Sequence, residues 1–436
     1  MQILIEPSDY SLLNVGDAAM VEVAATRLNA LWPAATLQIL SDTPELLPGD
    51  LPRVTYLSTA GRRQWFEGGY LSITLLSQRF SMPLVPRIEG LLRRRRPEWI
   101  DPIKHLRRRL AGKKEDSPDS FLPSMQSADL LVVTGMGGIT DAFPDYALQL
   151  LHILNFAKRL GKTTAMFGQG MGPLQNPKLR ARAREVLPHV DLIALREGRV
   201  GRSLLDSLGV TREHVLVTGD DAIEIAFDRR VSRLGDGLGV NVRSAAYSGI
   251  TQSSLQQLGP MLLEAASACR ASVVAVPTSR HRGEQDSSAL RKLLAGHPLS
   301  DYGEGLDTPR KVIDQIQRCR VLVTASYHAA VFSLAQGTPV VCLVNSDYYA
   351  DKFMGLVEQF GGGGEIISLQ DSRLAATLPQ SVAKVWHAAE QVRPALLASA
   401  RKQIAQGRAA YQQLYDIVCA KGKNLITSSA SARAGR

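Results

Sequence analysis

The sequence predicts an α/β protein in which two doubly wound parallel sheets face each other across a cleft. Short apolar runs alternate with segments of helical length, most runs are followed by glycine or polar residues, and the pattern starts again after a polar linker. This alternation is typical of parallel βαβ units. Because ligands bind at the carboxyl ends of strands in open parallel sheets, the residues that follow each strand are the candidate site residues.

In the first half of the chain, seven short runs predict the strands of one sheet. The runs cover residues 2–5, 37–40, 54–57, 130–133, 163–167, 192–195 and 215–217. The segment 130–133 is apolar throughout, as expected for a strand buried on both faces. Helices are predicted over about 18–31, 146–160 and 198–208. The last two are each followed by a glycine, which commonly ends a helix.

The second half repeats the pattern after a polar, glycine-containing linker at 228–239. Strands are predicted over 239–242, 272–276, 321–324 and 340–344, and helices over about 253–269, 307–318 and 328–336. A last amphipathic helix is predicted from about 378 to 419. The predicted domains are 1–228 with a basic insertion at about 60–120, then 229–375, a C-terminal helix at 376–423 and a disordered tail at 424–436.

The chain has 436 residues, of which 45% are hydrophobic and 21% charged, and these values exclude wholesale disorder. Its four cysteines form no C-x-x-C pair, which argues against a disulfide scaffold or a cysteine zinc site and predicts a reducing, cytoplasmic setting. The first residues lack the basic and apolar regions of a signal peptide. No run of about 18 apolar residues predicts a transmembrane helix.

One segment makes the protein basic. The net charge is +10, and the segment from Arg79 to Lys114 holds twelve basic and three acidic residues. Its apolar residues recur at helical spacing between prolines, which predicts short amphipathic helices suited to an anionic membrane surface. The alternative is a solvated helical insertion packed on the first domain. The segment lacks a known nucleic-acid-binding motif, so nucleic acid is not an expected partner.

Three loops of the first domain suit close approach of a ligand. Asn14-Val15-Gly16-Asp17 opens the first long helix, where backbone N–H groups bind anions or sugar hydroxyls, although the same residues also suit a helix cap. The loops 134–138 and 168–173 are rich in glycine, which allows the backbone to approach a ligand or simply to turn tightly. Neither loop has the dinucleotide spacing or a Walker lysine.

Charged residues follow two further strands of the first domain. Arg196 suits a carboxylate or a phosphate, or else an interdomain salt bridge. Asp220 and Asp221 are adjacent, so on an extended chain their side chains point in different directions and at most one faces the site. Capping of the next segment is an equally good explanation for the pair, and no metal is expected.

In the second domain, Arg243 follows a strand, and so does the segment 277–281, which ends in Arg280-His281. His328 starts a helix in Thr324-Ala325-Ser326-Tyr327-His328-Ala329, where the helix dipole favours anions. The segment 345–352 offers Lys352 for an anionic group and Tyr348 for stacking on a sugar, or else it is a solvated loop.

Taken in order, these motifs resemble the polysaccharide pyruvyl transferase family. The matching pattern is N-x-G-D, a G-G loop, G-Q-G-x-G-P, a strand-end arginine, G-D-D-A, and S-x-H-A before G-x-P-V-V, and it covers nearly all of 1–360 apart from the basic insertion. Two departures are visible. Ser326-Tyr327-His328 lacks the arginine of the family's S-R-x-H-A pattern, and Asp220-Asp221-Ala222-Ile223 stands where the family often has D-P-A-F.

The resemblance implies two Rossmann-like domains in a GT-B-like arrangement and a transferase of exopolysaccharide biosynthesis. It implies transfer of a pyruvyl group from phosphoenolpyruvate to two hydroxyls of a sugar, giving a pyruvate ketal and phosphate without cofactor or metal. The acceptor would be a lipid-linked polysaccharide or its precursor, and the protein would be peripheral on the inner face of the membrane. The alternatives are a GT-B glycosyltransferase that uses a nucleotide-sugar and a non-catalytic sugar-binding relative.

The resemblance and the strand-end positions together assign expected roles. The catalytic candidates are His328, Asp17 and Asp221; the donor-binding candidates are Arg196, Arg243, Arg280, Lys352, Gly137 and Gly138; the acceptor-binding candidates are Asn14, Gln169 and Tyr348. Phosphoenolpyruvate carries a carboxylate and a phosphate, so a basic cluster suits it. A histidine suits proton transfer or stabilisation of the leaving phosphate, and a carboxylate suits a base for the sugar hydroxyl.

Overall fold

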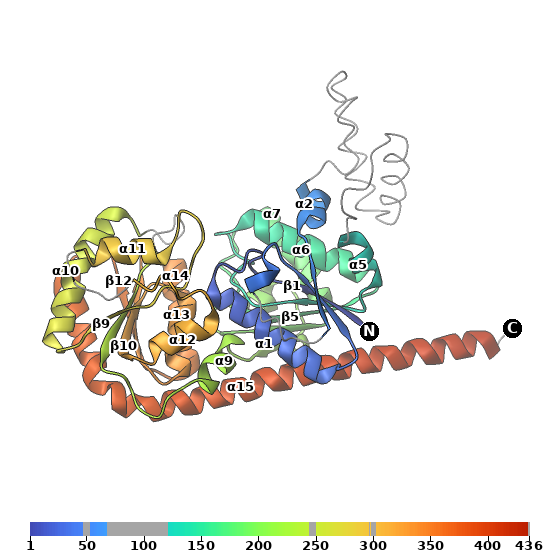
Figure 1. The fold of residues 1–436 in the computed structure, drawn as a ribbon. Helices are drawn as coiled ribbons and strands as arrows, with labels where there is room; N and C mark the ends of the chain where they lie inside the picture. The colour runs from blue at the N-terminus through green and yellow to red at the C-terminus, as the bar shows by residue number, and fades with distance from the viewer. Residues whose placement is uncertain (47–52, 68–120, 244–249, 296, 298–301, 435–436) are drawn as a thin grey trace, which may run out of the picture.

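Two parallel sheets form the centres of two lobes that lie side by side (Figure 1). The computed structural model describes the whole chain except residues 47–52, 68–120, 244–249, 296, 298–301 and 435–436. The basic segment from Arg79 to Lys114, for which we predicted amphipathic helices, therefore lies outside the described residues. Among the helices that are described, none is both long and apolar enough to cross a membrane.

The first sheet has seven strands in the order β3-β2-β1-β4-β5-β6-β7, all parallel. They are β1 (Gln2–Glu6), β2 (Thr36–Leu40), β3 (Val54–Leu57), β4 (Leu130–Val133), β5 (Thr163–Gln169), β6 (Leu192–Leu195) and β7 (Val215–Val217). The order reverses between β1 and β4, which is the switch point where doubly wound sheets bind ligands.

The second sheet has five parallel strands in the order β12-β11-β10-β8-β9. They are β8 (Gly237–Asn241), β9 (Val273–Ala275), β10 (Cys319–Thr324), β11 (Val340–Val344) and β12 (Gly364–Ser368). Here the switch point lies between β8 and β10. The two doubly wound sheets confirm the predicted fold class, and their strands fall on either side of the predicted boundary between residues 228 and 229.

Helices cover the faces of both sheets (Figure 1). They are α1 (Val15–Leu31), α2 (Ala60–Glu67), α5 (Phe121–Ser127), α6 (Pro144–Arg159), α7 (Pro177–Val186), α8 (Gly201–Ser207), α9 (Ala222–Asp228), α10 (Gln252–Ala268), α11 (Asp286–Leu293), α12 (Pro309–Ile316), α13 (Tyr327–Ala335), α14 (Asp347–Phe360) and α15 (Leu374–Ala434). Short 3-10 turns at Pro44–Leu46, Leu187–His189 and Arg212–His214 complete the described elements.

The segment 345–352, for which a solvated loop was one alternative, instead leads into helix α14, which begins at Asp347. The Ser346 side chain accepts a hydrogen bond from the Tyr349 N–H and caps its first turn. Beyond the polar first turn, Phe353, Leu356 and Phe360 lie on one buried face, at the spacing of an amphipathic helix. Tyr348 and Lys352 therefore stand on a rigid element in the first two turns of this helix.

The last helix, α15, runs along both lobes (Figure 1). It contacts α10, β10 and β12 in the second lobe and then α9, α1 and β6 in the first. We expected a disordered tail at 424–436, whereas the structure continues α15 to Ala434. The helix thus ties the two lobes together after the chain has crossed between them once.

The lobes also share an apolar core. Val15, Met20 and Val23 of α1 belong to one buried cluster with Val312 of α12 and Phe332 of α13. Beside this cluster, backbone hydrogen bonds join the lobes: the Val15 N–H donates to Thr278 O (3.0 Å) and the Arg280 N–H donates to Leu13 O (2.9 Å). Burial of apolar surface and paired backbone groups hold the two switch points against each other.

Candidate active site

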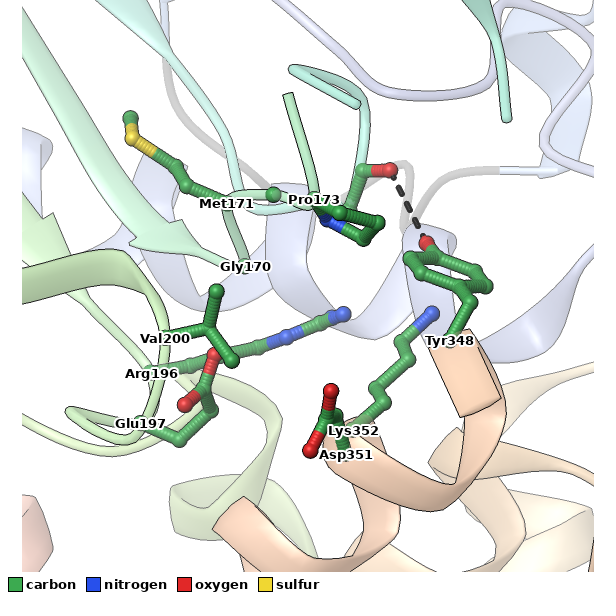
Figure 2. A pocket seen from close by; sticks show the side chains of 11 residues that line it. Gly170, Met171, Pro173, Arg196, Glu197, Val200, Tyr348, Asp351 and Lys352 are labelled. Atoms are coloured by element: carbon green, nitrogen blue, oxygen red, sulfur yellow. Dashed lines mark hydrogen bonds between the residues drawn. The ribbon is translucent and has the colours of Figure 1, made fainter. Parts of the chain in front are cut away.

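A cavity of about 200 Å³ lies between the lobes, at the carboxyl ends of both sheets. The first lobe lines it with residues that follow β1, β4 and β6, and the second with residues that follow β8, β9 and β10 and with α14. The lining residues are Ser8, Asn14, Asp17, Met136, Gly137, Phe143, Arg196, Arg243, His281, Ala325, Ser326, Tyr327, His328, Tyr349 and Lys352. A smaller cavity, drawn in Figure 2, shares Gly137, Arg196 and Lys352 with it.

Arg196 is a buried cation whose donors are only partly used. Its side chain is 1% exposed and its guanidinium stacks over the Tyr327 ring, 3.9 Å from the centroid. Nη1 lies 3.7 Å from Asp220 Oδ2, which is too far for a hydrogen bond. Nε and Nη2 are buried and have no hydrogen-bond partner among the residues that the structure describes. Buried donors are normally paired, and an anion that brings acceptors would satisfy these two.

The donors of Arg196, Lys352 and Tyr348 converge on Gly137. A methyl group on Gly137 would lie 2.9 Å from Tyr348 Oη, 3.2 Å from Arg196 Nη2 and 3.3 Å from Lys352 Nζ. The Tyr348 hydroxyl donates a hydrogen bond to Gly137 O at 3.2 Å, and this bond is the dashed line in Figure 2. The glycine lets these three side chains approach the loop closely, and a small ligand at this point can reach the donors of Arg196 and Lys352.

Lys352 stands among aromatic rings. Its Nζ lies 5.1 Å from the centroid of Tyr327, 5.4 Å from that of Tyr348 and 5.5 Å from that of Tyr349. Burial, followed by the charge of Arg196, lowers the pKa of Lys352 well below its ordinary value. An anion bound beside Nζ would reverse this effect and favour the ammonium form.

His328 lies at the start of α13, behind the N-cap Ser326. It is 7% exposed, and its Nε2 lies 3.8 Å from Asp220 Oδ2 and has no hydrogen-bond partner within the described part of the chain. Burial and the charges of Arg196, Lys352 and Arg243 lower the pKa of His328 well below its usual value, which favours the neutral imidazole. A methyl group on Gly16 would come within 2.0 Å of this ring, so glycine in the N-x-G-D motif lets α1 pack against the histidine.

The two adjacent aspartates face different ways and only one of them lies beside the cavity, as predicted, although the backbone at Asp221 is helical rather than extended. Asp221 accepts hydrogen bonds from Arg27 Nη1 (2.6 Å) and from Tyr411 Oη (2.8 Å), so it joins α1, α9 and α15 away from the cavity. Asp220 instead lies between Arg196 and His328, and burial raises its pKa to about 6. We selected Asp221 as the catalytic candidate; the geometry places Asp220 beside the site and gives Asp221 a structural ion pair.

This arrangement separates the effects of two neighbouring substitutions. Asp221→Ala should lower the free energy of unfolding by about 1–3 kcal/mol, because Arg27 and Tyr411 each lose a buried acceptor while Arg27 keeps Glu224. Asp220→Asn should change stability far less, yet alter ligand binding, because Asp220 faces Arg196 and His328. Chemical denaturation and ligand titration of both variants check this. Equal stability losses in the two variants would contradict the assignment.

The end of the cavity next to β1 is acidic. Asp17 accepts a hydrogen bond from Ser8 Oγ (2.8 Å), and burial together with the charge of Asp9 raises its pKa to about 6. Asn14 caps α1 by accepting a hydrogen bond from the Gly16 N–H (3.0 Å), and it also lines the cavity. Arg243 pairs with Asp286 (3.2 Å) and reaches the cavity between the acidic and the basic end.

Tyr348 lines the smaller cavity only, and besides Asp221 three further predicted site residues line neither cavity. Gln169 is fully buried, and its amide donates to Thr134 O and Phe167 O (both 3.0 Å), so it braces the glycine loops. A methyl group on Gly138 would meet Met136 and Tyr146, so Gly138 serves side-chain packing. Arg280 bonds Leu13 through its backbone, while the next residue, His281, reaches the cavity instead.

Sequence reasoning missed three residues that the structure brings to the site. Tyr327 stacks on Arg196, Asp220 lies behind His328, and His281 pairs with Asp9 through Nε2 and Oδ2, 3.1 Å apart. Tyr327 lies between the serine and the histidine of the S-Y-H motif, so its presence at the site could have been predicted from the sequence. The partners of Asp220 and His281 come from distant parts of the chain.

Comparison with solved structures defines the fold class as GT-B-like. UGT73P12 of Glycyrrhiza uralensis, complexed with glycyrrhetinic acid 3-O-monoglucuronide, matches at 10% identity and a TM-score of 0.54, covering 100% of each chain. UGT89C1 of Arabidopsis thaliana, complexed with UDP, matches at 10% identity and 0.54, covering 96% of this chain and 99% of that one. A putative UDP-N-acetylglucosamine 2-epimerase from Listeria monocytogenes matches at 12% identity and 0.51, covering 95% and 94%.

Comparison of the sequence with family models identifies the family as well as the fold. The family model for polysaccharide pyruvyl transferase matches residues 14–347, which is more than half of the chain and includes most of the cavity. The chain belongs to the polysaccharide pyruvyl transferase family, which is a family of enzymes. Membership of this family implies a polysaccharide acceptor. No curated protein matches the sequence.

Proposed function

We propose that this chain transfers the pyruvyl group of phosphoenolpyruvate to two hydroxyls of one sugar, forming a pyruvate ketal and releasing phosphate. The observation that supports this donor is the buried guanidinium of Arg196 beside Lys352 and His328, because its Nε and Nη2 have no hydrogen-bond partner among the described residues. A phosphate brings the oxygen acceptors that match this fork of donors.

The donor occupies the basic end of the cavity in this proposal. Its phosphate binds Arg196 and Lys352 near Gly137, and its carboxylate turns toward Arg243 and the start of α13. Tyr348 holds the Gly137 loop in place through its hydroxyl. The positive charges that lower the pKa of His328 are then matched by the negative charges of the bound donor, and the imidazole takes up a proton.

The acceptor occupies the acidic end, where Asn14 and Asp17 lie. Ketal formation moves two hydroxyl protons: one is matched by the proton that turns the donor methylene into a methyl group, and the other leaves on phosphate. Asp17, with a pKa raised to about 6, is suited to exchange one of these protons near neutral pH. His328 protonates the departing phosphate, whose negative charge Arg196 and Lys352 stabilise.

A titration of the wild-type chain tests the donor directly. Calorimetry with phosphoenolpyruvate should give a saturable binding curve, and a nucleotide-sugar such as UDP-glucose should give none at the same concentrations. The opposite pattern would favour the glycosyltransferase alternative. Binding of neither donor, with only sugars bound, would favour a non-catalytic relative.

We extend the proposal to a lipid-linked acceptor at an anionic membrane surface. The support is the sequence of the segment from Arg79 to Lys114, with its two arginine rows at 93–96 and 107–109. The chain should cosediment with vesicles containing anionic lipid at low salt and dissociate at high salt. Changing the seven arginines of the two rows to glutamine should abolish the binding, and unchanged cosedimentation would remove the segment from the proposal.

A further inference from the structure

The acidic end of the cavity contains a second histidine that the donor chemistry leaves unused. His281 follows β9 in the second lobe, is about one third exposed and lines the same cavity as His328 and Asp17. Its Nε2 lies 3.1 Å from Oδ2 of Asp9, a residue of the loop after β1 in the first lobe. A ring nitrogen held by a carboxylate fixes the tautomer of an imidazole and leaves its other nitrogen as the acceptor.

Asp9 is itself held rigidly. One of its carboxylate oxygens accepts from the Ser11 N–H (3.0 Å) and the Ser11 hydroxyl (2.6 Å), and the other from the Leu13 N–H (3.1 Å). Although burial opposes it, hydrogen bonds from His281 and Ser11 hold the pKa of Asp9 below its ordinary value. The carboxylate is therefore ionised and oriented before any ligand arrives.

We propose that His281 is a catalytic base that removes the proton of one acceptor hydroxyl, with Asp9 as the positioning residue that orients its ring. This inference rests on the proposed pyruvyl transfer. It complements Asp17, because a ketal requires two hydroxyls of the sugar to lose their protons. The two lobes thus each contribute one base to the acceptor end: Asp17 from α1 and His281 from the loop after β9.

The step balances without any further reactant. The hydroxyl oxygen forms a bond to C2 of phosphoenolpyruvate and its proton passes to His281. C3 gains this proton from His281 and becomes a methyl group, which regenerates the base. The bond from C2 to the phosphate oxygen then breaks, and phosphate leaves with the electron pair. The second hydroxyl oxygen bonds to C2, and its proton leaves on phosphate. One ketal and one phosphate form from one donor and one diol.

The charges around His281 give this role a pH signature. Asp9 and Asp17 act on the imidazole from the first lobe and Arg243 from the second. The hydrogen bond to Asp9 is the largest influence and raises the pKa of His281 above its ordinary value of about 6.5. A base must be deprotonated, so the transfer rate should fall as the pH drops through this raised pKa.

The test compares the wild-type chain with three variants. His281→Gln removes the base, Asp9→Asn removes the charge that raises its pKa, and Arg310→Gln is the matched control. The control breaks a different ion pair between the lobes, that of Arg310 on α12 with Glu22 on α1. Each protein is titrated with phosphoenolpyruvate and then assayed for transfer to a panel of methyl glycosides with free vicinal or 4,6-hydroxyls.

We expect His281→Gln to lose about 10²- to 10⁴-fold in kcat, the range for an acid–base group. Its dissociation constant for phosphoenolpyruvate should stay within about threefold of wild type, because the donor binds at the basic end of the cavity and His281 lies at the acidic end. Asp9→Asn should shift the acid limb of the pH profile to lower pH, which a purely structural contact would not do. Arg310→Gln should match the wild type.

Two outcomes would overturn the assignment of His281 alone: an active wild type with an equally active His281→Gln variant, or equal losses in His281→Gln and Arg310→Gln with an unshifted pH profile in Asp9→Asn. A wild-type chain that binds no phosphoenolpyruvate, or that modifies no glycoside, would instead contradict the proposed function. The donor titration and the rate comparison therefore separate the two failures.

Discussion

Replacing Arg196 with glutamine should weaken phosphoenolpyruvate binding by about 10²- to 10⁴-fold. Nε and Nη2 of Arg196, which have no partner in the part of the chain that the structure describes, would each form a charge-assisted hydrogen bond with the donor. Such bonds contribute about 1.5–3 kcal/mol each. The affinity of Arg196→Lys for phosphoenolpyruvate should lie between those of the wild type and Arg196→Gln, because lysine keeps the charge but lacks the planar pair of donors. Calorimetric titration measures all three affinities.

A control for this variant lies three residues further along the chain. Arg199 forms an exposed ion pair with Asp351 and Glu358 across the lobes and does not line the cavity. Arg199→Gln should bind the donor as the wild type does. A folded Arg196→Gln protein with an affinity within about threefold of wild type would remove Arg196 from the donor site.

Replacing His328 with alanine should lower kcat by about 10²- to 10⁴-fold while unfolding stays cooperative. Burial and three neighbouring cations lower the pKa of His328 and so favour its neutral form before the donor binds. Donor binding offsets those cations, so the wild type should take up protons on binding, and its affinity should fall as pH rises. Calorimetry in two buffers of different ionisation enthalpy measures this uptake, which should be smaller in His328→Ala.

The exposed His189 provides the matched control for the loss of a histidine. His189→Gln should retain both the turnover and the proton uptake of the wild type. Near-normal turnover in His328→Ala would show that this histidine does not take part in the chemistry. Full proton uptake in that variant would assign the uptake to Lys352 or Asp220 instead.

The strands were predictable because burial on both faces leaves an unbroken apolar run. The predictions at 130–133, 192–195 and 340–344 coincide with β4, β6 and β11, whose residues are all buried. Helix α14 was missed because its first turn is polar and aromatic, and its buried face begins only at Phe353. The edge strand β12 was missed because only Ile367 of its five residues is buried.

The basic end of the site was predictable because its residues directly follow strands or open helices. Arg196, Arg243 and His328 all line the cavity. Alternation along an extended chain predicts that Asp220 and Asp221 diverge, but not which of them faces the site. That choice depends on Arg27 and Tyr411, which belong to α1 and α15. The pairing of Asp9 with His281 depends on how the lobes meet, which no local pattern encodes.

The mass of a sugar acceptor after incubation with the wild-type chain and phosphoenolpyruvate tests the central claim most directly. Free and lipid-linked sugars should be offered together, with Arg196→Gln as the inactive comparison. A pyruvyl transferase acting at this cavity increases the acceptor mass by one pyruvic acid minus one water and releases one phosphate per acceptor modified. An acceptor that gains a hexose from a nucleotide-sugar, and nothing from phosphoenolpyruvate, would contradict the account.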